Sequence, residues 1–102
     1  MEIIILDGKC MRDFESAHDY LSRVLRLPEY YGRNLDALYD CLSEFFTDDS
    51  IIILFNGDEM KNSLGVYGDK LVKVFEDAMC ESGFSFIYIY IRAKTRTIIC
   101  PN

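Results

Sequence analysis

The sequence predicts an α/β domain of two layers, in which a short, mostly parallel three-stranded sheet packs against three to four helices. Apolar runs bounded by turn residues alternate along the 102-residue chain with segments of helical periodicity. Strands that alternate with helices favour parallel pairing through right-handed crossovers. The last apolar run has two unlike faces, which favours two layers over three. The length predicts one domain over residues 1–102.

The first strand and helix follow from the opening residues. Ile3–Leu6 is a continuous apolar run, which indicates a central strand or a strand buried on both faces. Apolar residues then recur at helical spacing from Phe14 to Leu25, with Asp13 as the expected N-cap. Pro28 disfavours helix at the residue before it. We therefore expect a strand and then a helix that ends ahead of this proline.

A second helix is expected from about Asn34 to Phe46, with the side chain of Asn34 as its cap. Its helical wheel has two unlike sides. The apolar stripe expected to face the core is Leu35, Leu38, Leu42, Phe45 and Phe46. The opposite side carries an acidic row of Asp36, Asp40 and Glu44, which are spaced four residues apart.

The second half of the chain predicts two more strands and a long helix. Ile51–Phe55 is a buried strand, and a short helical or turn segment begins at Asp58. A longer helix is expected from about Tyr67 to Glu81. The third strand, Phe84–Ile91, alternates isoleucines with aromatic residues, and we expect the isoleucine face to meet the helices. Arg96–Cys100 could return as an extra edge strand.

The negative charge of the chain is concentrated in one fifth of its length. The formal net charge is −6, and residues 29–49 hold six acids and a single base, Arg33. Nucleic-acid binding requires Lys and Arg against phosphate, so this field excludes direct binding of RNA or DNA. A basic protein partner is expected instead, with charge acting mainly on the rate of encounter.

The cysteines and apolar runs indicate a cytoplasmic protein without a membrane span. The four cysteines form no CxxC pair and lie far in sequence from the lone His18, so no zinc site is expected. We interpret the cysteines as reduced and mostly packed. Ile3–Leu6 is too short for a secretory signal or a transmembrane helix.

The sequence contains no recognisable catalytic arrangement. His18 is the only histidine, and it falls at the edge of an apolar stripe, where a packed, hydrogen-bonded role is expected. No G-x-S-x-G or phosphate-loop motif is present. Asp36 and Asp40 share one solvated helix face, whereas an acid–base pair needs a cleft that separates the two pKa values. We therefore predict no enzyme activity, no metal and no cofactor.

Two features favour a binding role for the acidic row over an ordinary solvated face. Residues 29–49 contain no lysine to balance it, and Tyr30-Tyr31-Gly32 stands just ahead of the helix. Tyrosine is favoured at interfaces because it combines a large, stiff surface with a polar tip. One or both tyrosines could instead anchor the loop, with Gly32 permitting a tight or positive-φ backbone.

Residues 27–42, LPEYYGRNLDALYDCL, closely resemble the central loop and helix of the barstar family of intracellular inhibitors of bacterial ribonucleases. The resemblance extends in weaker form over residues 2–90. It implies a barstar-like fold, which agrees with the pattern above. It also implies that the loop and helix plug the active site of a small basic, barnase-like ribonuclease.

The resemblance assigns partner-binding roles to positions in this segment. Asp40 would be the main anchor, with its carboxylate in the place of an RNA phosphate. Asp36 would add a second charge-assisted contact, and Tyr30 would lie on an active-site histidine. The residues that would shape the loop, flank the anchor or add an outlying contact are Tyr31, Gly32, Asn34, Tyr39 and Asp77.

Several residues depart from the family pattern. Tyr39 stands where the family has tryptophan, and Glu44 replaces a glycine near the contact edge. Arg33 replaces an acid and would repel a basic partner locally. A second hypothesis therefore stays open, a non-inhibitory interaction module on the same fold. A monomer is favoured over a dimer paired through the tyrosine face of Phe84–Ile91.

Overall fold

Three parallel strands form one layer of the protein, and the computed structural model describes residues 1–89 of the chain. The strands are β1 (Glu2–Asp7), β2 (Ser50–Phe55) and β3 (Ser85–Tyr88), in the order β1-β2-β3. The predicted α/β class with a parallel three-stranded sheet is confirmed. β2 is the central strand, and β1 is an edge strand of this sheet.

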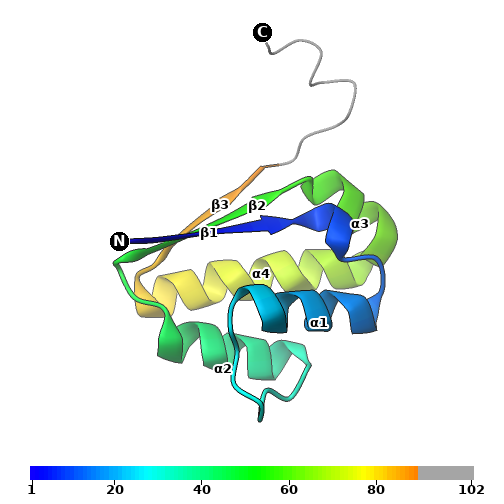
Figure 1. The fold of residues 1–102 in the computed structure, drawn as a ribbon. Coiled ribbons are helices and arrows are strands. Elements are labelled where there is room, and N and C mark those ends of the chain that lie inside the picture. Colours follow the sequence, from blue (N-terminus) through cyan, green and yellow to red (C-terminus); the bar gives the residue numbers. More distant parts are fainter. Residues whose placement is uncertain (90–102) are drawn as a thin grey trace, which may run out of the picture.

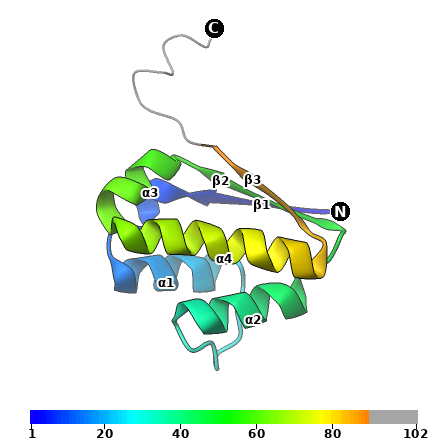
Figure 2. The ribbon, with the colours of Figure 1, turned by 180° about the vertical axis from the view of Figure 1, so that it is seen from behind.

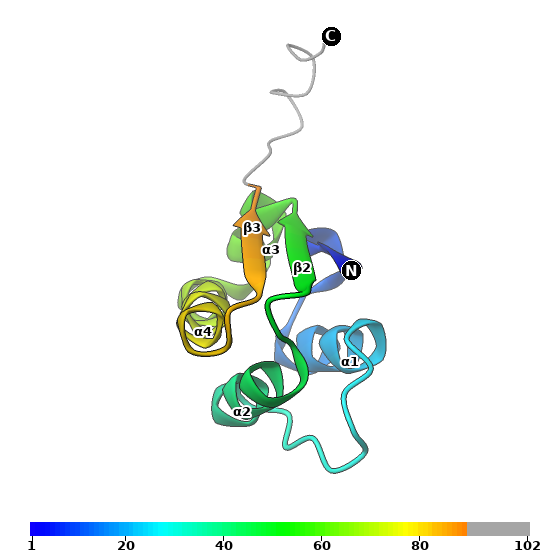
Figure 3. The same ribbon diagram turned by 90° about the vertical axis from the view of Figure 1, so that its left-hand side faces the viewer.

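Residues 1–89 form four helices, three of which lie over one face of the sheet (Figure 1). They are α1 (Phe14–Val24), α2 (Leu35–Phe45), α3 (Gly57–Leu64) and α4 (Val66–Ser82), and a 3₁₀ turn, Gly8–Cys10, follows β1. Helices α1, α2 and α4 all lie on the same side of the strands (Figure 1, Figure 3). Seen from behind, α4 lies in front of α1 and α2 lies farthest from the sheet (Figure 2). The loop that joins α1 to α2 is therefore carried on the side away from the sheet.

Helix α1 begins and ends with local hydrogen bonds. Asp13 accepts a bond from the Ser16 backbone N–H while the Ser16 hydroxyl accepts one from the Asp13 N–H, which is a capping box. At the other end the Leu27 N–H donates to the Ser22 carbonyl, with Arg26 at a φ of 57°. This Schellman-type ending turns the chain out of the helix two residues before Pro28.

The prediction that Ile3–Leu6 is central or buried on both faces is wrong. Ile4 and Leu6 are buried, whereas the side chains of Ile3 and Ile5 are 58% and 54% exposed. The physical reason is that the helices cover only one face of the sheet, so alternate residues of β1 point away from them.

The expectation for the faces of the third strand is also wrong. Phe86 and Tyr88 pack against the core, and Ile87 is exposed. The ring of Phe86 stacks on Phe75 of α4 with centroids 4.9 Å apart, so the larger rings fill the space between sheet and helix. Tyr88 is thus partly buried beneath the sheet, and the predicted preference for a monomer stays a prediction. The predicted strand beyond Ile89 and the edge strand at residues 96–100 lie outside the described residues.

Helix α2 packs its apolar stripe against α4, with two adjustments to the prediction. Leu38 and Leu42 are fully buried, and Leu35 is partly buried. Phe45, predicted to face the core, is exposed. Phe46 follows the last helical residue in extended backbone, and its ring meets Phe84 edge-on at 6.3 Å. Phe46 therefore fills the space at this end of the helix.

The cysteines differ from the expectation of mostly packed thiols. Cys41 is buried, but Cys10 and Cys80 are exposed, and all three are free thiols. Cys100 lies outside the described residues. Within residues 1–89 no helix has the length and apolar character needed to cross a membrane.

Candidate partner-binding site

The loop between α1 and α2 separates its two tyrosines. The Tyr31 N–H donates to the Pro28 carbonyl at 3.0 Å, which closes a turn with Glu29 and Tyr30 at its tip. The side chain of Tyr30 is 75% exposed, whereas that of Tyr31 is 7% exposed. Of the two alternatives left open for this pair, Tyr31 is the anchor and Tyr30 is free to contact a partner.

The backbone after Tyr31 bends at Arg33, not at Gly32. Arg33 has a φ of 57°, in the left-handed region, and Gly32 has no positive φ. The glycine makes a close approach, because a Cβ at this position would lie in tight contact, 3.1 Å from the Cβ of Ala37. The expected alternative of a left-handed backbone at Gly32 is therefore wrong, and the lack of a Cβ is favoured by the nearby Ala37.

Asn34 caps α2 as predicted. Its side-chain oxygen accepts a bond from the Ala37 N–H at 2.8 Å, and its amide donates to the Gly32 carbonyl at 3.2 Å. Asp36 follows in the first turn, where the positive end of the helix dipole stabilises a carboxylate. The cap thus joins the loop rigidly to the helix that carries the acidic row.

The acidic row faces solvent. Asp36, Asp40 and Glu44 are all exposed on α2. Among residues 1–89, no ion pair involves Asp36 or Asp40. Arg33, the sole base of the acidic segment, pairs with Asp19 of α1 instead. The two aspartates are therefore available for cations of another molecule.

A groove of about 350 Å³ lies between the loop and α2. We call it the loop groove. Five of the predicted partner-binding residues line it together with Ala37 and Cys41, namely Tyr30, Tyr31, Gly32, Asp40 and Glu44. Burial raises the pKa of the Cys41 thiol, and the nearby charges of Glu44 and Asp40 raise it further, so the thiol stays protonated. The groove thus combines aromatic surface with two carboxylates, a combination that suits a cation.

Asp36 lines a second hollow, of about 460 Å³, between the start of α2 and α4. Its other lining residues are Leu35, Asp69, Lys70, Lys73 and Val74. Asp77 does not line either hollow, and its carboxylate accepts a bond from Lys73 at 3.0 Å. Tyr39 is partly buried against the core on α2. The structure therefore brings five of the predicted residues together around the loop groove, whereas Asp36 lines the second hollow and Asp77 lies farther along α4.

His18 was expected to be packed and hydrogen-bonded, but its link to the loop was missed. The ring is fully buried, with Nδ1 2.5 Å from the Tyr31 hydroxyl and Nε2 2.7 Å from the Tyr67 hydroxyl. Burial lowers the pKa of His18, and the charge of Arg33 lowers it further. The three residues are 13 and 49 positions apart, so sequence spacing gave no sign of the contact. Within the described residues, no cluster of His, Cys, Asp and Glu could hold a metal ion.

These observations define a small α/β protein that presents an exposed tyrosine and an acidic helix on one edge. The family model described as Barstar (barnase inhibitor) matches residues 1–91, and the chain belongs to this family. The chain is also 40% identical over 81 residues to "Putative ribonuclease inhibitor YrdF" of Bacillus subtilis (strain 168). That match covers 79% of this chain and 89% of the relative. The resemblance found in residues 27–42 is thereby confirmed, and the fold is barstar-like.

Proposed function

We propose that this protein inhibits a small basic ribonuclease by inserting the loop and the start of α2 into the enzyme's active site. The observation that carries the proposal is the exposure of Asp36 and Asp40 on α2, with Asp40 lining the loop groove together with Tyr30. Neither aspartate forms an ion pair within residues 1–89. Family membership and the name of the relative support the same role.

The chemistry of a ribonuclease site explains why carboxylates would fit it. Such a site holds phosphate, so its cationic side chains are arranged in advance and are poorly neutralised when the site is empty. Carboxylates on a capped helix lose little conformational entropy on entering it. Charge-assisted hydrogen bonds to Asp40 and Asp36 would replace those to RNA phosphates. Barnase and barstar themselves are the usual illustration of strong coupling between such charge pairs.

The loop groove gives the partner a place for a side chain. A basic or imidazole side chain of the enzyme would enter beside Asp40 and Glu44 and lie against the ring of Tyr30. Tyr31, Gly32 and Asn34 would act by shaping the loop, and Tyr39 would flank the anchor. Asp77 would be an outlying contact that shares its charge with Lys73.

The biological test is co-expression with small ribonucleases. A host that carries an inducible, barnase-like ribonuclease should survive when this protein is produced and die when it is absent. Replacing Asp40 by Asn should abolish the rescue. Replacing Asp49 by Asn is the matched control, because Asp49 is an exposed carboxylate just before β2. Among the described residues its carboxylate pairs only with the chain's N-terminus.

Titration calorimetry with a catalytically inactive barnase gives the binding measurement. We expect a one-to-one complex, and Asp40→Asn should raise the dissociation constant by about a hundredfold or more, as expected for a buried charged anchor. Asp36→Asn should have a smaller effect. If Asp40→Asn bound as tightly as the parent, the anchor would be misassigned. Binding without protection of the host would favour a non-inhibitory module.

A further inference from the structure

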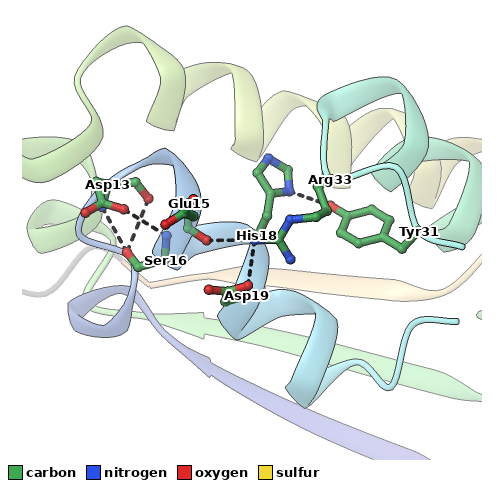
Figure 4. A network of polar contacts seen from close by, with 7 residues as sticks. All are labelled: Asp13, Glu15, Ser16, His18, Asp19, Tyr31 and Arg33. Atoms are coloured by element: carbon green, nitrogen blue, oxygen red, sulfur yellow. Dashed lines mark hydrogen bonds and ion pairs between the residues drawn. The ribbon is translucent and has the colours of Figure 1, made fainter. Parts of the chain in front are cut away.

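Two side chains of the binding loop are held by helix α1 (Figure 4). The Tyr31 hydroxyl meets Nδ1 of His18 at 2.5 Å, and Nη2 of Arg33 lies 2.5 Å from a carboxylate oxygen of Asp19. The same Arg33 nitrogen donates to the Glu15 carbonyl at 3.4 Å. We call these contacts the α1 clasp. Only Gly32 lies between the two held residues.

The backbone of Arg33 shows why such a clasp is needed. A φ of 57° places a residue with a Cβ in the left-handed region, which is unfavourable for any residue except glycine and, to a lesser degree, asparagine or aspartate. Such a conformation persists when surrounding contacts stabilise it. The ion pair to Asp19 and the bond to the Glu15 carbonyl are those contacts. Breaking them would remove two of the contacts that hold the loop just before the helix cap at Asn34.

We propose that the α1 clasp positions the binding loop, so that Asp19 and Arg33 control partner affinity without touching the partner. The proposal rests on the proposed function for the identity of the partner. Holding the loop in its bound shape lowers the conformational entropy lost on binding. Arg33 is thus a positioning residue whose charge is balanced within the molecule. This differs from the sequence-based expectation that Arg33 repels a basic partner.

The two views of Arg33 give different outcomes for Arg33→Gln. This change makes the protein more negative, so repulsion by Arg33 predicts faster association with a basic ribonuclease and no faster dissociation. Loss of the clasp predicts a dissociation rate about threefold to fivefold higher, because substitutions that weaken a complex act mainly on its dissociation rate. Asp19→Asn should raise the dissociation rate by a similar factor. The partner used is catalytically inactive barnase, observed by stopped-flow fluorescence or surface plasmon resonance.

Matched controls carry the same charge changes elsewhere. Arg12→Gln and Asp49→Asn each alter one exposed charge outside the clasp, and both should leave the dissociation rate unchanged. The double variant Asp19→Arg with Arg33→Asp restores an ion pair of reversed polarity and should recover the parental dissociation rate. A general loss of stability would not be rescued in this way.

Hydrogen exchange of the free protein tests the clasp without any partner. The Tyr31 amide, which bonds to the Pro28 carbonyl, should exchange about threefold to fivefold faster in Arg33→Gln and Asp19→Asn. The amide of Ile52 in the central strand should be unchanged. Unchanged exchange at Tyr31 would overturn the proposal, as would faster exchange with an unaltered dissociation rate. Failure of the parent to bind any ribonuclease would instead overturn the proposed function, while the exchange data would still decide whether the clasp holds the loop.

Discussion

Lowering the pH from 7 to 5.5 should destabilise this protein through its only histidine. His18 is fully buried, and its two ring nitrogens face the hydroxyls of Tyr31 and Tyr67. A neutral imidazole donates from one nitrogen and accepts at the other. Protonation turns the accepting nitrogen into a donor, so one tyrosine hydroxyl loses its acceptor and a charge is buried. The charged groups that act on the ring are Asp19 of α1 and Arg33 of the loop, which are paired with each other.

The sign of the effect follows from the lowered pKa. Burial lowers the pKa of His18 below its ordinary value of 6.5. The unfolded chain therefore takes up a proton at a higher pH than the folded protein does. Stability contributed by neutral His18 is fully present above pH 6.5 and is lost as the pH falls towards the folded pKa. One proton corresponds to at most about 1.4 kcal/mol per pH unit. The free energy of unfolding should therefore fall between pH 7 and 5.5, by at most about 1 kcal/mol.

Urea denaturation followed by far-UV circular dichroism at several pH values measures this change. A loss of about 1 kcal/mol corresponds to a fall in Tm of about 4–8 °C for a domain of this size. His18→Gln provides the control, because glutamine can both donate and accept but does not titrate. Its stability should vary little over this range, since ordinary carboxylates titrate at lower pH. A parent protein with no pH dependence, or a variant with the full slope of the parent, would refute the reasoning.

Three further predictions concern the loop, the cap and the charge. Asn34→Ala removes the N-cap of α2 and should lower the free energy of unfolding by about 1 kcal/mol in urea denaturation, whereas an unchanged midpoint would show that the cap is dispensable. Tyr30→Ala should leave Tm unchanged, because the ring is exposed, yet raise the dissociation constant for inactive barnase by about tenfold; equal affinity would place the ring outside the interface. Raising NaCl from 50 to 500 mM should slow association with barnase about tenfold in stopped-flow experiments, and a salt-independent rate would argue against charge-steered encounter.

Local signals in the sequence were sufficient for most element boundaries. Asp13 and Asn34 are N-caps as predicted, because capping depends on hydrogen bonds within one helical turn. The acidic row on α2 is exposed because its members are four residues apart and opposite the stripe that includes Leu38. The sheet faces could not be assigned in this way, since both faces of Phe84–Ile91 are apolar. Packing of Phe86 against Phe75 decided which face is covered.

By itself the sequence determined the order of strands and helices, the capped acidic helix and the barstar resemblance. Each of these depends on residues that lie close together along the chain. Tertiary structure alone decided that Tyr31 turns in while Tyr30 stays out, and that Arg33 binds Asp19. These outcomes depend on α1 meeting both the loop and α4, which brings together groups 13 to 49 residues apart. No local pattern encodes such distances, since they are set by how the helices pack.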